Sequence, residues 1–153
     1  MCKSIGFLGT AAPRAADMTL LLELGMGAGL LGGTWLARAG RFRLHAACQS
    51  AVVAFNLILI ALTMFPAFHR EVFPTLSGRI GRPFYLIATI HATLGSIVEI
   101  AGLYILLAAG TDLLPEKFRM TRYKLWMSSV LLVWWIVLLL GLATYARWYV
   151  APG

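Results

Sequence analysis

The first candidates for chemistry in this chain are ionisable residues that lie within apolar sequence. Glu23, His45, His91 and Glu99 each interrupt a long apolar run, and His69 follows the second run. Imidazole and carboxyl groups can ligate haem or a metal, hydrogen bond a quinone, or pass protons. An ionisable group is costly in lipid, so each of these residues predicts a functional role or a structural partner.

The apolar runs that carry these residues are long enough to cross a bilayer as helices, because about 20 residues span the hydrocarbon core. The runs are roughly 18–38, 45–66, 84–109 and 125–146. The chain is 60% hydrophobic and 12% charged. The sequence therefore predicts an all-α integral membrane four-helix bundle with short loops. Residues 1–17 are predicted to be a flexible tail, and 18–153 a single domain.

The net charge of +7 does not indicate nucleic acid as a partner, because the Lys and Arg residues flank the spans, where they meet lipid headgroups. Four spans place both termini on one side of the bilayer, here called side A, and the loops 38–44 and 110–124 on side B. Side B carries seven basic residues and side A six. Basic residues in short loops count most, which favours a cytoplasmic side B and non-cytoplasmic termini.

The first span contains a stripe of glycines. Gly25, Gly29 and Gly33 recur every four residues, and small residues at this spacing let two helix backbones approach closely. The stripe predicts either a homodimer or partner-subunit interface, or close packing against another helix of the same chain. The spacing alone leaves both readings open.

The second span has a polar face made by His45, Gln49 and Asn56, which are separated by four and seven residues. An amide facing lipid would lack hydrogen-bond partners, so this face is predicted to point into the bundle. The polar face is expected to make interhelical hydrogen bonds, to form a polar track for protons, or to supply donors around a cofactor. Glu99, near the middle of the third span, is expected to be a neutral acid that hydrogen bonds either Asn56 or a backbone carbonyl.

Depth in the membrane limits which groups can meet. His91 lies about 12 Å from side A at the helical rise, and Glu23 and Tyr145 lie in the same half, so the three are predicted to converge at a cofactor-binding site. His45 is more than about 15 Å away and cannot share that site. His69 and His91 are the remaining pair of potential metal ligands, although an axial offset of about 10–15 Å separates them.

Several segments between Leu44 and Tyr145 resemble a known family. They are RLHAACQ with His45, FPAFHRE with His69, RPFYLIATIHA with His91, and WWIVLLLGLATYARWY with Gly141 and Tyr145. These segments resemble the small four-helix membrane family catalogued as domain of unknown function four-twenty. The family pattern has a further histidine in the last basic loop, where this chain has Phe118.

The resemblance implies a bacterial inner-membrane protein linked to cytochrome oxidase assembly. The four histidines of the family look like two haem-ligating pairs. Phe118 breaks the side-B pair here, which leaves at most one haem b, on His69 and His91. The favoured function is a non-catalytic assembly factor or accessory subunit of a respiratory or photosynthetic electron-transfer complex. The alternative is a b-type haem or quinone-binding electron carrier, and a third reading is a proton-coupled carrier using Glu23 and Glu99.

Overall fold

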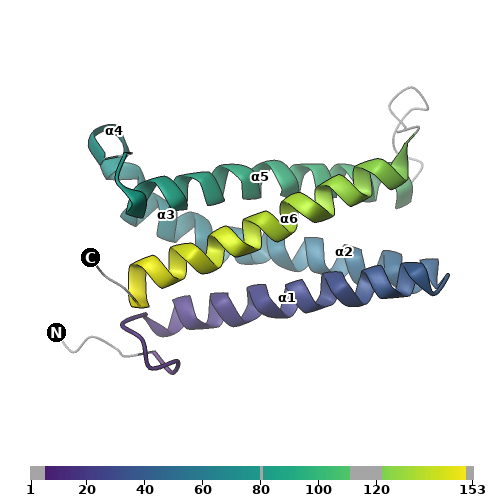
Figure 1. Cartoon of the computed structure of the whole chain (residues 1–153), viewed down its shortest axis with the longest axis horizontal. Helices are drawn as coiled ribbons and strands as arrows, with labels where there is room; N and C mark the ends of the chain where they lie inside the picture. The colour runs from purple at the N-terminus through teal and green to yellow at the C-terminus, as the bar shows by residue number, and fades with distance from the viewer. Residues whose placement is uncertain (1–5, 80, 111–121, 151–153) are drawn as a thin grey trace.

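A computed structural model describes residues 6–79, 81–110 and 122–150, which form an antiparallel bundle of four long helices (Figure 1). The four helices are α1 (Arg14–Arg38), α2 (Phe42–Leu59), α5 (Pro83–Gly110) and α6 (Tyr123–Tyr145). Four helical segments are long and apolar enough to cross a membrane. The prediction of an all-α four-helix bundle is confirmed, and the chain is a multi-pass membrane protein.

Shorter elements extend the second and fourth spans. They are η1 (Ile60–Met64), α3 (Phe65–Glu71), η2 (Phe73–Thr75), α4 (Leu76–Arg79) and η4 (Ala146–Val150). Both ends of the chain, α3 and α4 lie at one end of the bundle, which is side A, and the α1–α2 turn lies at the other end, side B (Figure 1).

The first helix begins earlier than predicted, and part of the predicted tail is attached to the bundle. α1 starts at Arg14 rather than at residue 18. Gly6 N donates a hydrogen bond to Ala12 O at 2.9 Å, and Ala11 N donates to Tyr149 O at 3.3 Å. Residues 6–13 therefore lie against η4 at the end of the fourth span.

The α1–α2 turn is short because a glycine allows α1 to end abruptly. Gly40 has a φ of +72°, a left-handed conformation that glycine adopts without steric cost. Arg41 N donates a hydrogen bond to Leu36 O at 2.9 Å, so this carbonyl near the end of α1 has a partner. α2 then starts at Phe42, three residues before the expected position, and runs antiparallel to α1.

The second span continues well past its predicted end at residue 66. Pro66 has no N–H to donate and crowds the carbonyl four residues before it, so a regular α-helical ladder cannot pass through this position. The π-helical turn η1 lies just before this proline, and α3 continues the helix to Glu71. The hydroxyl of Thr63 donates to Leu59 O at 2.8 Å.

The packed core lies in the middle of the bundle and towards side B. It contains Leu30 from α1, Val53 from α2, Val98 from α5 and Trp134 from α6. Large apolar residues point outwards from every long helix, which suits a lipid environment. Examples are Leu31, Trp35, Leu62, Ile100 and Leu132.

The glycine stripe of α1 packs partly within the chain. A Cβ on Gly29 would lie 3.0 Å from Val52 Cγ2, and a Cβ on Gly33 would lie 2.5 Å from Gln49 Nε2, so both glycines face α2. Gly25 has no atom within 4 Å of its Cβ position and does not belong to this contact. Gly29 and Gly33 therefore serve close packing between two helices of one chain.

Candidate functional site

A cavity of about 650 Å³ occupies the side-A half of the bundle. α2 packs along α1 and also against α5, whereas α3 packs mainly on its neighbours η1 and η2. The second span thus separates from the other three helices from η1 onwards, and the cavity lies in the space that this opens. Most of its wall is apolar, with a few polar side chains, as is typical of small-molecule sites.

Glu23 and His91 come together in this cavity, on either side of a glycine. Both side chains line the cavity. A Cβ on Gly141 would lie 2.8 Å from Glu23 Oε2 and 3.0 Å from His91 Cε1. The carboxyl group of Glu23 on α1 and the imidazole ring of His91 on α5 therefore lie next to each other at Gly141 of α6. The absence of a side chain at Gly141 makes room for both groups.

One backbone contact fixes the orientation of the His91 ring. His91 Nδ1 lies 2.9 Å from Val137 O. A carbonyl oxygen only accepts hydrogen bonds, so Nδ1 carries the proton and Nε2 of the neutral ring is left as an acceptor. His91 therefore lies in the side-A half, as predicted, and lines the same cavity as Glu23 and Tyr145.

Tyr145 also lines the cavity, and its hydroxyl joins a hydrogen-bonded network. Tyr145 OH donates to Asp17 Oδ1 at 2.5 Å, and lies 2.7 Å from Thr10 Oγ1. Since the one phenolic proton goes to Asp17, Thr10 is the donor in the second contact. Leu8 N donates to Asp17 Oδ2 at 3.0 Å. The network ties residues 8–10 and the start of α1 to the end of α6.

Asp17 was missed by the sequence reasoning, which placed it in a tail. Its exposed fraction is 0%. The sequence did carry a signal for this residue, because Asp17 lies at the edge of an apolar span and has hydroxyl-bearing residues on both sides. A buried carboxylate needs donors, and Tyr145 and Leu8 supply them.

In the middle of the bundle, Asn56 and Glu99 form the hydrogen bond that was one of the two expected arrangements. Asn56 Nδ2 donates to Glu99 Oε2 at 2.8 Å. Both residues are buried, with Glu99 only 3% exposed. Asn56 lines the inner end of the cavity.

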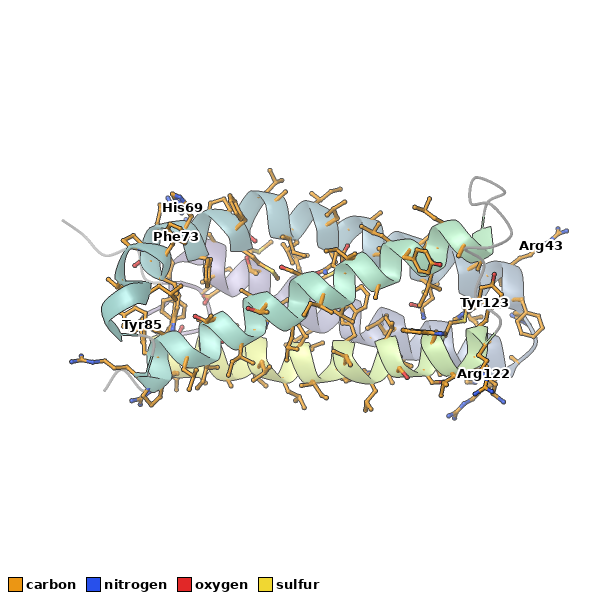
Figure 2. The ribbon with its side chains drawn as sticks, turned by 90° about the horizontal axis from the view of Figure 1, so that it is seen from above. Arg43, His69, Phe73, Tyr85, Arg122 and Tyr123 are labelled. Atoms are coloured by element: carbon orange, nitrogen blue, oxygen red, sulfur yellow. The ribbon has the colours of Figure 1, made fainter. Side chains whose placement is uncertain are left out.

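The structure does not bring His69 to His91. The His69 side chain is exposed and its ring stacks on Phe73, with centroids 5.5 Å apart and an interplanar angle of 11°. His69 is not among the residues that line the cavity, and Figure 2 shows it on the outer side of α3. Two axial histidines for one haem are therefore not assembled here, and the pair does not fit that group.

On side B, His45 acts as a hydrogen-bonding residue. His45 Nδ1 lies 2.7 Å from Gly33 O, so it donates to this carbonyl. Cys48 Sγ donates to Gly29 O at 3.4 Å. Phe118, on which the comparison with a fourth histidine rests, lies outside the described residues. Within the part of the chain that the structure describes, no three His, Cys, Asp or Glu side chains gather as metal ligands would.

Comparisons of this chain with protein-family models, with curated proteins and with solved structures find no match. The resemblance drawn from the histidine-containing segments thus stays a prediction.

Proposed function

We propose that this chain is a membrane subunit that holds an amphipathic redox molecule of the quinone class in its side-A cavity. The observation that carries the proposal is the meeting of Glu23 and His91 at Gly141, inside a mostly apolar cavity of about 650 Å³. A quinone has a polar ring with oxygens that accept hydrogen bonds and an apolar tail, and both parts have matching surroundings here.

The cavity wall offers a route for such a tail. Leu62 and Phe65 line the cavity and are also 72% and 63% exposed. They belong to the part of the second span that separates from the other helices. An apolar tail could therefore leave the cavity between η1–α3 and the rest of the bundle, directly into lipid.

The polar residues of the cavity supply complementary hydrogen-bonding roles. His91 presents Nε2 as an acceptor because Nδ1 bonds Val137 O. A carboxyl group in a poorly solvated site favours its neutral form, so Glu23 can donate to a quinone oxygen. Glu23 thus donates to an oxygen of the quinone, whereas His91 Nε2 accepts from a hydroxyl of the reduced quinol, because the oxidised ring has no proton to donate.

The wider role in this proposal is an accessory subunit or assembly factor of a bacterial respiratory or photosynthetic complex. The chain is small, consists almost entirely of spans, and has a resemblance to a family linked to cytochrome oxidase assembly. A quinone held near a partner subunit would be supplied to, or stabilised beside, a redox centre of that partner.

The test begins with the protein purified in mild detergent and extracted with solvent, followed by chromatography for bound quinones. We expect about one bound quinone per chain. When decylubiquinone is added to quinone-depleted protein, it should quench tryptophan fluorescence, because Trp134 and Trp148 line the cavity. Glu23→Leu should abolish both signals, because it removes the donor to the quinone oxygen. His69→Leu is the matched control, since His69 lies outside the cavity, and it should retain both.

A protein that neither contains nor binds a quinone would overturn the proposal. The visible spectrum of the reduced protein separates the haem alternative, which would give a sharp α band. Native gel electrophoresis of solubilised membranes tests the wider role, because an accessory subunit should migrate with a larger redox complex.

A further inference from the structure

The buried carboxyl of Glu99 has an oxygen that the fold leaves without a partner. Asn56 satisfies Oε2, whereas Oε1 is buried and has no hydrogen-bond partner among the described residues. Buried polar atoms are nearly always paired, so an unpaired oxygen in the middle of a bundle calls for an explanation. A single amide is also too little to stabilise a carboxylate charge at this depth.

The cavity reaches the immediate neighbourhood of this carboxyl. Asn56, the hydrogen-bond partner of Glu99, lines its inner end. Gly95, Ser96 and Val98, which directly precede Glu99 on α5, line it as well. The cavity thus extends from the exposed side-A residues around Arg70 and Glu71 to the residues next to Glu99.

Gly95 lies on the route between the two ends of the cavity. His91, Gly95 and Glu99 follow one another at intervals of four residues, so they share one face of α5. A Cβ at Gly95 would be 3.5 Å from Val137 Cγ1, an ordinary contact distance, so a larger side chain would narrow the space between α5 and α6.

The bundle is closed beyond Glu99 in the direction of side B. One turn further along α5, a Cβ on Gly102 would lie 3.3 Å from Trp134 and 3.5 Å from Val53. The hydrophobic core at this level includes Leu30, Val52 and Val53, which are not among the residues that line the cavity.

We infer that Glu99 is a proton-binding site that exchanges its proton with side A, through the cavity and past Gly95. Glu99 holds the proton as a neutral acid, with Oε2 accepting from Asn56 and Oε1 carrying the proton. This inference goes beyond the proposed quinone site and needs no bound ligand. The other titratable side chains along the cavity are Glu23, Arg70, Glu71, His91, Tyr145 and Tyr149.

Infrared spectroscopy of the ligand-free protein tests the inference directly. A protonated carboxyl gives a carbonyl stretching band that is separate from amide absorption and shifts when its proton is exchanged for deuterium. We expect such a band in the wild-type protein, with a component that is lost in Glu99→Gln but kept in Glu23→Gln, because Glu23 can also hold a proton. The Glu99 component should shift after transfer to D2O. The band should persist when sodium ions are added at constant pH.

Two glycine variants test the route. Gly95→Leu should slow the deuterium shift by about tenfold, because the leucine raises the barrier in the path. Gly25→Leu is the matched control, since Gly25 has no atom within 4 Å of its Cβ position, and it should leave the rate unchanged. An infrared band that is the same in Glu99→Gln as in the wild type, equal rates in Gly95→Leu and wild type, or displacement of the proton by sodium would each overturn the inference.

If Gly95→Leu does not fold, chemical labelling of the wild-type protein tests the inference instead. Dicyclohexylcarbodiimide is an apolar reagent that couples to protonated carboxyl groups within membranes. Peptide mass spectrometry should find it on Glu99, with less labelling as the pH rises. An unlabelled Glu99 at low pH would contradict a proton site that can be reached through the cavity. The outcome is independent of quinone content, so it can fail without affecting the proposed function.

Discussion

In the side-B half of the bundle, Gly29 and Gly33 let α1 lie directly against α2, whereas in the side-A half Gly141 leaves space that Glu23 and His91 occupy. On side B the contact is completed by polar bonds to the α1 backbone. On side A the second span separates from the bundle, and the glycine borders a cavity.

The same residue type therefore serves two purposes at the two ends of one molecule. A side chain added at Gly29 should cost stability, because the buried Val52 side chain there has little room to move. A side chain added at Gly141 should cost ligand binding, because it displaces the Glu23 carboxyl, which is the flexible end of a polar side chain. Variants at each end test this contrast.

The largest effect is expected for Gly29→Leu in the closely packed half. A Cβ at this position already lies 3.0 Å from Val52 Cγ2, and the β-branched Val52 is buried and restricted in its rotamers. Overpacking of this kind costs about 3 kcal/mol. The measurement is the thermal unfolding temperature of the purified protein in detergent.

Gly25→Leu provides the control for this experiment, one helical turn away. Nothing lies within 4 Å of its Cβ position, and we expect its unfolding temperature to match the wild type. If Gly29→Leu is as stable as Gly25→Leu, the α1–α2 contact is not close, and the proposed contrast between the two halves fails.

A somewhat smaller loss is expected for Asp17→Ala at the side-A end. The change leaves Tyr145 OH and Leu8 N without their buried acceptor, which costs about 2 kcal/mol. Residues 6–12 should then detach, and limited proteolysis should cut them faster than in the wild type. Tyr145→Phe removes the two contacts of the hydroxyl, with Asp17 and Thr10, but keeps the bond from Leu8 N to Asp17, so its cleavage rate should lie between those of the wild type and Asp17→Ala. Equal cleavage of all three proteins would show that the network does not hold the segment.

The arrangement of the spans could be predicted from sequence because it depends on length and hydropathy alone. Four apolar runs of sufficient length fix the number of helices and the side on which each loop lies. Depth along each helix was also sufficient to place Glu23, His91 and Tyr145 in one half and His45 in the other. These are properties of helical rise, which needs no knowledge of packing.

Contacts between helices could not be predicted to the same extent. The rotation of each helix decides whether a glycine faces lipid or another helix, so Gly25 and Gly29 differ although they share a spacing. The π-helical turn before Pro66 and the separation of α3 depend on tertiary packing, and they place His69 outside the cavity. The hydrogen bond from Tyr145 to Asp17 likewise depends on tertiary packing, because it joins residues that are 128 positions apart in the sequence.

In the cavity, Gly141→Ala should affect ligand binding more than stability. The added Cβ would lie 2.8 Å from Glu23 Oε2, a carboxyl at the end of a flexible side chain that can turn away. We expect a change in unfolding free energy of about 1 kcal/mol or less, from a small steric adjustment. Quinone affinity should fall about tenfold, which corresponds to about 1.4 kcal/mol. Gly32→Ala, at an open position of α1, should change neither quantity.

The smallest effect is expected for His45→Ala, which tests the side-B half without disturbing its glycines. The change removes one hydrogen bond, from His45 Nδ1 to Gly33 O, and a bond between helices in a membrane is worth about 0.6 kcal/mol. The unfolding temperature should fall only slightly. Bound quinone, and any haem present, should remain at the wild-type level, because His45 lies outside the cavity. Loss of a bound cofactor in His45→Ala would place a ligand site on side B and reverse the roles assigned to the two halves.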